Sequence, residues 1–329
     1  MSETPPAPSP LDAAAVAAMV GGRLEGGEVA GLHGLATPQS AGPADVVFFR
    51  SAPDTRGVPP KPELLDAVLA CAAGLLLVDE AFPAVARPLC RVADPGLAAA
   101  KLQQHWRGDA FRVAPGIAPS AEVHPDAQVA ATAALAGGVQ VGADCVVEDG
   151  VVLHPGVVLY PRVRVGAGTV IHANTVVGGP GFGYVWDGQR HQPMPQVGGV
   201  EIGRGVEIGA NVTIDAGTLE PTVIGDGCIL DNLVQVAHNC VLGRAVVLCA
   251  QVGLSGSTIL EDGVVMGGQS GSGGHVRVGA GTQVAGRGGI TADIGPGRQV
   301  AGLPAVDLAE HQRMQAALRR LARRRKGDA

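Results

Sequence analysis

The chain has 329 residues, enough for two or more domains, and a formal net charge of −6, which does not suggest a nucleic-acid partner. Its 50 glycines and 3% aromatic residues are unusual for a globular enzyme. We expect no signal peptide and no transmembrane segment, because the start is acidic and proline-rich and no run reaches the ~18 apolar residues a spanning helix needs. The six cysteines form no CxxC pair and are interpreted as reduced core residues of a cytoplasmic protein.

The first 115 residues are predicted to contain a disordered segment and an α/β domain. Residues 1–10 are expected to be disordered. Helical and strand-like patterns alternate over residues 11–115, which is typical of a small α/β domain. The predicted helices are Leu11 to Met19, Pro62 to Cys71 and Pro95 to Trp106, and the predicted strands are Asp45 to Phe49, Gly74 to Val78 and Leu89 to Val92. Composition leaves open whether this domain only packs against the next one or also holds part of a ligand.

From Ile117 the chain repeats with a period of six. Every sixth residue as far as Val177 is aliphatic, and the residue after it is often small. This period fits neither an α-helix nor a simple strand, and it is the signature of a parallel β-helix whose aliphatic residues point into a triangular prism. The repeat is interrupted by an excursion at residues 178–200 and an insertion from Asp215 to Thr222, and Ser272 breaks the aliphatic pattern. The predicted prism covers residues 116–303.

Two segments outside the regular coils leave alternatives open. The excursion holds Phe182, Tyr184 and Trp186, much of the scarce aromatic content, and a functional loop and an oligomer contact are equally supported. Residues 304–329 are predicted to form a C-terminal helix and a basic tail. Charge alone favours a solvated tail or a trimer-forming bundle over a docking patch for an acidic partner.

His238 is the histidine best placed for chemistry. Val236 is predicted to point inward, so His238 stands at an outer corner, and one coil of eighteen residues sets Gly256 beside it on the next coil. The bare Gly256 N–H suits an oxyanion, and Asp231 is expected to orient the imidazole as a general base. A surface histidine without a role is equally compatible with the pattern. His124, His154 and His172 are interpreted as solvent-facing turn residues, and no set of histidines has metal-ligand spacing.

Several strings closely resemble the UDP-3-O-acylglucosamine N-acyltransferase family of lipid A synthesis. They are Gly181-Phe182-Gly183-Tyr184, Thr213-Ile214-Asp215 and Gln235-Val236-Ala237-His238-Asn239, and the order of domains matches as well. The resemblance implies a mainly β fold, a left-handed parallel β-helix with a small N-terminal α/β domain that binds uridine and a C-terminal α-helix. It also implies a cytoplasmic homotrimer, without metal or cofactor, that moves a 3-hydroxyacyl chain from acyl carrier protein to the 2-amino group of UDP-3-O-acylglucosamine.

The resemblance also assigns residue roles. His238 corresponds to the catalytic base, Asp231 to its partner and Gly256 to the oxyanion donor. The residues that correspond to substrate contacts are Asn232, His275, Phe48, Phe182 and Tyr184. The uridine segment departs from the family, because the Asn and Tyr expected after Phe48 are absent. Two alternatives therefore stand beside this function: another trimeric hexapeptide-repeat sugar acyltransferase or acetyltransferase, and a paralogue that binds without catalysis.

Overall fold

The computed structural model describes residues 9–53, 59–107, 113–302 and 308–324 and divides the chain into two compact units. The first unit spans residues 1–112 and the second spans residues 113–329. Each described unit has its own hydrophobic core. The predicted boundaries of the disordered start and of the C-terminal helix fall in or beside residues outside these ranges.

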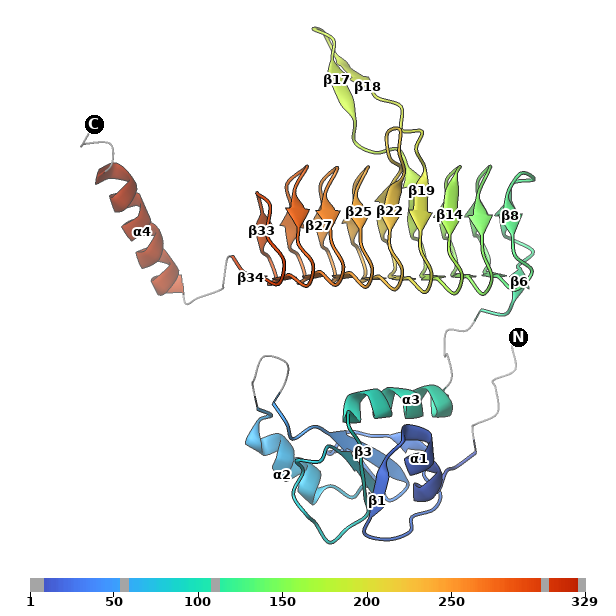
Figure 1. Cartoon of the computed structure of the whole chain (residues 1–329), viewed down its shortest axis with the longest axis vertical. Helices are drawn as coiled ribbons and strands as arrows, with labels where there is room; N and C mark the ends of the chain where they lie inside the picture. The colour runs from blue at the N-terminus through green and yellow to red at the C-terminus, as the bar shows by residue number, and fades with distance from the viewer. Residues whose placement is uncertain (1–8, 54–58, 108–112, 303–307, 325–329) are drawn as a thin grey trace. The chain divides into compact units, whose positions relative to one another are not determined.

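The first unit is a five-stranded sheet with helices on both faces (Figure 1). The strand order is β1-β5-β4-β3-β2; β1 is antiparallel to β5, and the other pairs are parallel. Residues of α1 and α3 share one core with Val46, Leu75 and Leu77, whereas α2 supplies Val68 to the core on the opposite face. The elements are α1 (Ala13–Val20), β1 (Arg23–Glu25), β2 (Gly34–Leu35), β3 (Asp45–Phe49), α2 (Pro62–Ala70), β4 (Leu75–Val78), β5 (Leu89–Arg91) and α3 (Pro95–Arg107).

The sequence prediction for this unit identifies its helices and its three central strands and misses β1 and β2. Helix α1 begins later than predicted because Asp12 is its N-cap, with its carboxylate accepting a 2.6 Å hydrogen bond from Ala15 N. The helix ends at Gly21, whose φ of 68° is the left-handed conformation that glycine adopts without strain. Strands β1 and β2 have only three and two residues, too few for a periodic pattern to be visible.

The second unit is the parallel β-helix predicted from the period of six. The chain visits three parallel sheets in turn, and Figure 1 shows the coils stacked in a row. Partners in neighbouring coils of a regular stretch are eighteen residues apart, as in Val141 with Leu159. The inward positions are buried from Leu135 to Ile290, whereas Ile117 at the first coil is 53% exposed because no coil covers it.

The three sheets have ten, nine and eight strands, in the order in which the chain first meets them. The ten-stranded sheet contains β6 (Gly116–Ile117), β9 (Ala134–Leu135), β12 (Val152–Leu153), β15 (Val170–Ile171), β20 (Glu207–Ile208), β23 (Ile229–Leu230), β26 (Val247–Leu248), β29 (Val265–Met266), β32 (Gln283–Val284) and β34 (Gln299–Val300). The nine-stranded sheet contains β7 (Glu122–Val123), β10 (Gln140–Val141), β13 (Val158–Leu159), β16 (Val176–Gly179), β21 (Thr213–Asp215), β24 (Gln235–Val236), β27 (Gly253–Leu254), β30 (Gly271–Ser272) and β33 (Gly289–Ile290). The eight-stranded sheet contains β8 (Gln128–Val129), β11 (Val146–Val147), β14 (Val163–Val165), β19 (Val200–Ile202), β22 (Thr222–Ile224), β25 (Val241–Leu242), β28 (Ile259–Leu260) and β31 (Arg277–Val278).

Ser272 keeps the inward position in spite of its polar side chain. Its hydroxyl lies 2.9 Å from Thr258 Oγ1 and accepts a 3.3 Å hydrogen bond from Ser255 N. The break in the aliphatic pattern is therefore a buried polar group with partners, which the fold tolerates.

The excursion and the insertion are paired with each other. The excursion carries an antiparallel hairpin of β17 (Tyr184–Trp186) and β18 (His191–Pro193), which projects from the coils in Figure 1. Its returning arm meets the insertion through hydrogen bonds from Val197 N to Thr218 O at 2.9 Å and from Gly198 N to Gly217 O at 2.8 Å.

The remaining features concern the last helix and the cysteines. Helix α4 spans Leu308–Arg324, and both ends of the predicted range 304–329 lie outside the described residues. None of the described helices is long and apolar enough to cross a membrane.

All six cysteines are free; Cys90, Cys145, Cys228 and Cys240 are buried as predicted, whereas Cys71 and Cys249 are only part-buried. Burial raises the pKa of the Cys228 and Cys240 thiols to about 11.

Candidate functional site

His238 lies in the turn between β24 and β25, beside the bare backbone of Gly256. Strand β24 pairs with β27 so that Val236 faces Leu254, and the same register sets Gly256 next to His238. A Cβ added to Gly256 would come 2.6 Å from His238 Nε2 and 2.7 Å from Cε1. Any larger residue there would displace the imidazole, so glycine is required by close approach. The predicted neighbourhood of these two residues is confirmed.

The backbone N–H of Gly256 is available to a ligand. In the part of the chain that the structure describes, this N–H donates to no recorded acceptor, whereas Gly256 O accepts from His275 N at 3.0 Å. A free N–H next to a base is the arrangement that stabilises an oxyanion formed during acyl transfer.

The residue that contacts the far side of the imidazole is Asn239. Asn239 Oδ1 lies 3.1 Å from His238 Nδ1, and both residues are part-buried. The excursion covers the same histidine, because a Cβ on Gly181 would come 2.6 Å from His238 Cβ. His238 is thus held between its own chain neighbour, the next coil and the excursion.

The structure does not bring Asp231 to His238. Asp231 follows β23 and His238 follows β24, so they lie at different corners of one coil. The Asp231 carboxylate accepts hydrogen bonds from Asn232 N at 2.7 Å and Ala250 N at 3.1 Å. Asn232 Oδ1 in turn accepts from Ala210 N at 2.8 Å. These contacts join neighbouring coils, and the expectation that Asp231 orients the base stays a prediction that the geometry of this chain does not support.

The carboxylate whose charge interacts with His238 is that of Asp215. Strand β21 pairs with β24 so that Ile214 faces Val236, which sets Asp215 opposite Ala237, next to His238. Asp215 Oδ2 accepts a 3.1 Å hydrogen bond from Gln235 Nε2. Burial raises the pKa of the Asp215 carboxyl, while the Gln235 hydrogen bond and the charge of His238 oppose this shift.

Spacing did not reveal Asp215 because the insertion lengthens its coil. Asp215 lies 23 residues before His238, since the insertion falls between them, and counting by eighteen therefore misses it. Its presence in the string Thr213-Ile214-Asp215 was the only signal available.

The predicted substrate contacts are scattered over the structure. His275 is exposed and lies two coils from His238, in the residue after Gly274. Phe182 and Tyr184 are 82% and 53% exposed, with ring centroids 5.2 Å apart in an edge contact. Phe48 is 47% exposed on β3 of the first unit. Their roles, and that of Asn232, stay predictions.

The first unit has polar atoms without partners after its central strands. Asp79 Oδ2, beyond β4, accepts hydrogen bonds from Ser51 N at 2.7 Å and Ala52 N at 2.8 Å. Asp79 Oδ1 and Ser51 Oγ are buried without a hydrogen-bond partner among the described residues. They lie at the carboxyl ends of parallel strands, where α/β sheets commonly bind ligands.

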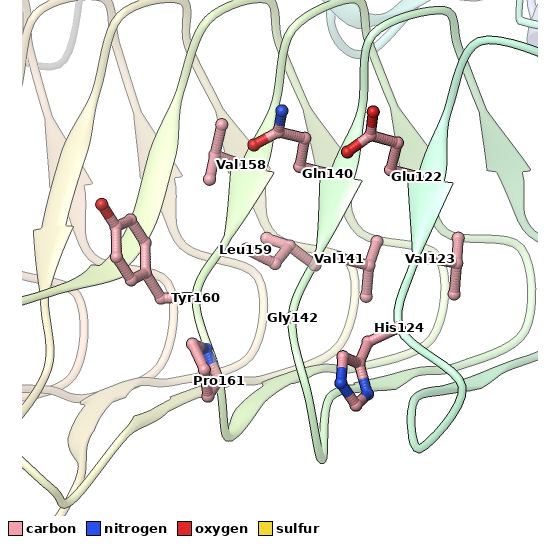
Figure 2. Close-up of a pocket in the computed structure, with 10 residues that line it drawn as sticks. All are labelled: Glu122, Val123, His124, Gln140, Val141, Gly142, Val158, Leu159, Tyr160 and Pro161. Carbon is pink, nitrogen blue, oxygen red and sulfur yellow. The ribbon is translucent and has the colours of Figure 1, made fainter.

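A pocket of about 490 Å³ lies on the prism, away from His238. Figure 2 shows it along β7, β10 and β13, with Glu122, Gln140 and Tyr160 among its lining residues. It holds His124 but no pair of groups suited to acyl transfer. His238 beside the Gly256 N–H therefore stays the candidate site, and this pocket does not.

One histidine at another corner differs from its prediction. His154 is 8% exposed, not solvent-facing, because its ring stacks on His172 with centroids 4.7 Å apart. His172 also lies 3.5 Å from Glu207 Oε1. Stacked positions eighteen residues apart bring these two rings together, and neither belongs to the His238 site.

The fold defines the chain as a parallel β-helix of hexapeptide repeats, and comparisons with known proteins agree. Residues 144–179 match the family described as bacterial transferase hexapeptide (six repeats). A UDP-3-O-acylglucosamine N-acyltransferase from Methylobacterium sp. (strain 4-46) is 45% identical over 163 residues, covering 50% of this chain and 46% of the relative. The enzyme of the same name from Methylobacterium nodulans is 46% identical over 160 residues, covering 49% and 46%.

A solved structure of a UDP-N-acetylglucosamine acyltransferase shares the fold. It is 28% identical, with a TM-score of 0.53, and the match covers 61% of this chain and 77% of that one. The chain spans about half the length of the curated relatives it matches. The predicted resemblance to the UDP-3-O-acylglucosamine N-acyltransferases is confirmed.

Proposed function

We propose that the chain is an N-acyltransferase that moves a 3-hydroxyacyl group from acyl carrier protein to the 2-amino group of UDP-3-O-acylglucosamine. The observation that carries the proposal is His238 Nε2 set against Gly256, whose backbone N–H is free, in a chain similar to enzymes of that name. An amine attacking a thioester needs a base and an oxyanion donor, and these two groups supply both.

The proposed reaction has two steps. His238 Nε2 accepts the amine proton as the nitrogen attacks the thioester carbonyl, and the Gly256 N–H stabilises the oxygen that becomes negative. When the intermediate collapses, the carbon–sulfur bond breaks and the imidazolium returns its proton to the carrier thiolate. A general base contributes about 10²–10⁴-fold to such a reaction, and one oxyanion donor about 10²–10³-fold.

The partners extend the proposal. We propose a cytoplasmic homotrimer and a carrier protein as donor, for which the arginines of α4, including Arg319 and Arg320, offer charge complementary to an acidic surface. The uridine would contact the first unit near Phe48, where the unpartnered atoms of Ser51 and Asp79 lie. These assignments follow from the resemblance and rest on the same test.

A transfer assay with mass-spectrometric detection tests the function. Purified protein receives UDP-3-O-acylglucosamine or UDP-N-acetylglucosamine with a panel of 3-hydroxyacyl carrier proteins. We expect an N-acylated product from the first acceptor alone, and loss of turnover by at least about 10²-fold in His238→Ala with the fold retained by circular dichroism. Full activity of His238→Ala would remove the mechanism, and no product with any donor from the folded wild type would remove the proposed reaction.

Two glycine substitutions test the proposed role of Gly256 as the oxyanion donor. Gly256→Ala should lower turnover about 10²-fold, because its Cβ would push against His238 Nε2 at 2.6 Å. Gly253→Ala is the matched control three residues earlier, where an added Cβ meets nothing within 4 Å. Equal turnover in both variants, measured under saturating substrates, would show that close approach at Gly256 is irrelevant.

A further inference from the structure

The side-chain amide of Asn239 has a fixed orientation. Its Nδ2 donates to Glu220 O at 3.1 Å, and its Oδ1 accepts from Thr218 N at 3.1 Å. A backbone carbonyl can only accept and a backbone N–H can only donate, so a flipped amide would set donor against donor and acceptor against acceptor. The atom that faces His238 Nδ1 at 3.1 Å is therefore the amide oxygen.

An amide oxygen opposite Nδ1 decides which imidazole nitrogen holds the proton. In a neutral histidine one nitrogen donates and the other accepts, and the tautomer is set by the partner. Asn239 Oδ1 accepts only, so Nδ1 carries the hydrogen and the lone pair is on Nε2. Nε2 is the nitrogen that faces Gly256.

Thr218 connects this amide to the excursion. Its hydroxyl lies 3.0 Å from Asn239 Oδ1 and 2.9 Å from Gln196 Oε1. Gln196 is itself oriented, because its Nε2 donates to Met194 O at 2.9 Å. The Thr218 hydroxyl thus lies between two carbonyl oxygens of fixed direction, one on the excursion and one beside the base.

The backbone supports the same junction. Val197 N donates to Thr218 O at 2.9 Å, and Asn239 N donates to Thr222 Oγ1 at 2.8 Å. Asn239 has a φ of 59°, a left-handed conformation that asparagine tolerates better than most residues. The insertion therefore contacts Asn239 directly, and the excursion is connected to Asn239 through Thr218.

We propose that Gln196, Thr218 and Asn239 are positioning residues that hold His238 in the tautomer with the proton on Nδ1 and the lone pair on Nε2. None of the three is required to touch the reacting atoms. The tautomer is a property of the protein alone, whereas its effect on turnover rests on the proposed function. In a serine protease, loss of the correct tautomer costs about 10⁴-fold in turnover, which shows how large such an effect can be.

The test measures the tautomer directly. Protein labelled with ¹⁵N-histidine is studied by long-range ¹H–¹⁵N correlation above about pH 8.5, where an imidazole is neutral, and His238 is assigned by comparison with His238→Gln. We expect the pattern of a protonated Nδ1 in the wild type and a mixture of tautomers in Asn239→Gly, which keeps the positive φ but lacks the acceptor. A wild-type His238 with its proton on Nε2 would overturn the inference.

Variants of Thr218 test whether its hydroxyl helps to hold the tautomer of His238. Thr218→Val removes the hydroxyl at nearly constant volume and should give a partial mixture of tautomers with kcat about tenfold lower and KM changed less than about twofold. Thr218→Ser should restore both. The control is Thr132→Val, whose hydroxyl donates to Asp149 Oδ1 at 2.8 Å on another coil. An unchanged tautomer and an unchanged kcat in Thr218→Val would show that Thr218 is not a positioning residue.

The two proposals fail separately. A protonated Nδ1 in a folded protein that transfers no acyl group would sustain the tautomer inference and refute the proposed function. Acyl transfer by a protein whose His238 carries its proton on Nε2 would refute the tautomer inference and sustain the proposed function.

Discussion

At the scale of single residues, the site depends on which atoms are left without a partner. Among the residues that the structure describes, the Gly256 N–H donates no hydrogen bond and Nε2 of His238 lies against Gly256, whereas the Asn239 amide has each of its atoms occupied. A group that is already bonded holds its neighbours in place, and a group that is free can act on a substrate. The Asp231 oxygens accept backbone hydrogen bonds, whereas Asp215 Oδ2 accepts one from the Gln235 side chain, next to His238.

The raised pKa of Asp215 gives a pH dependence of stability. Below the unfolded value of about 3.9, both states hold the proton and the carboxyl adds no penalty. As the pH rises the unfolded chain ionises first, because burial raises the folded pKa. The wild type should therefore lose stability relative to Asp215→Asn as the pH rises above about 4, until the folded group ionises as well.

Melting temperatures of the two proteins across this pH range, followed by the β signal in circular dichroism, measure the effect. Asp144→Asn is the matched control, because Asp144 is exposed and has a φ of 59°, which asparagine also adopts. A Tm difference between Asp215→Asn and wild type that does not change with pH would contradict the linkage.

At the scale of the coil, stability comes from one inward side chain for every six residues. Leu248 is fully buried between Leu230 and Met266 of the neighbouring coils, and each such position contacts those above and below it. Where a polar residue takes the position, as at Ser272, the neighbouring coil supplies Thr258 as a partner. The column as a whole, and not any single strand of two residues, forms the core.

Leu248→Ala should destabilise the prism by about 2–5 kcal/mol, because it leaves a cavity that the stacked coils cannot close. Leu219→Ala is the control, since Leu219 is 77% exposed in the insertion and should change stability by less than about 0.5 kcal/mol. Chemical denaturation followed by circular dichroism compares the midpoints. Equal midpoints would mean that the inward positions are not the source of stability.

At the scale of the whole molecule, two units with separate cores should unfold separately. Trp106 is 1% exposed in the core of the first unit, and Trp186 is 56% exposed on the hairpin of the second. The chain has two tryptophans, so Trp186→Phe leaves Trp106 as a fluorescence reporter of the first unit alone. In this variant the fluorescence transition should not coincide with the circular dichroism transition of the prism.

Leu102→Ala provides the matched perturbation in the Trp186→Phe background. Leu102 is fully buried beside Trp106 in the same core, so the substitution should move the fluorescence midpoint and leave the prism transition in place. Coincident transitions that shift together would show that the two units unfold as one cooperative body.

The sequence alone determined the prism and the pairing of His238 with Gly256. A strict period of six requires inward aliphatic residues, and constant coil length makes the partner of any position a matter of counting, which set Gly256 beside His238. The alternating helices and strands of the first unit followed from local periodicity in the same way. Its two shortest strands did not, because two or three residues carry no period.

Tertiary structure alone decided what surrounds His238. The insertion changes the count between Asp215 and His238, so no spacing predicts that they are neighbours. The direction of the Asn239 amide depends on Thr218 and Glu220, about twenty residues earlier, and the link to Gln196 depends on how the excursion returns. Periodicity describes residues that repeat, whereas an irregular loop takes its place from contacts with distant residues, and those contacts surround His238.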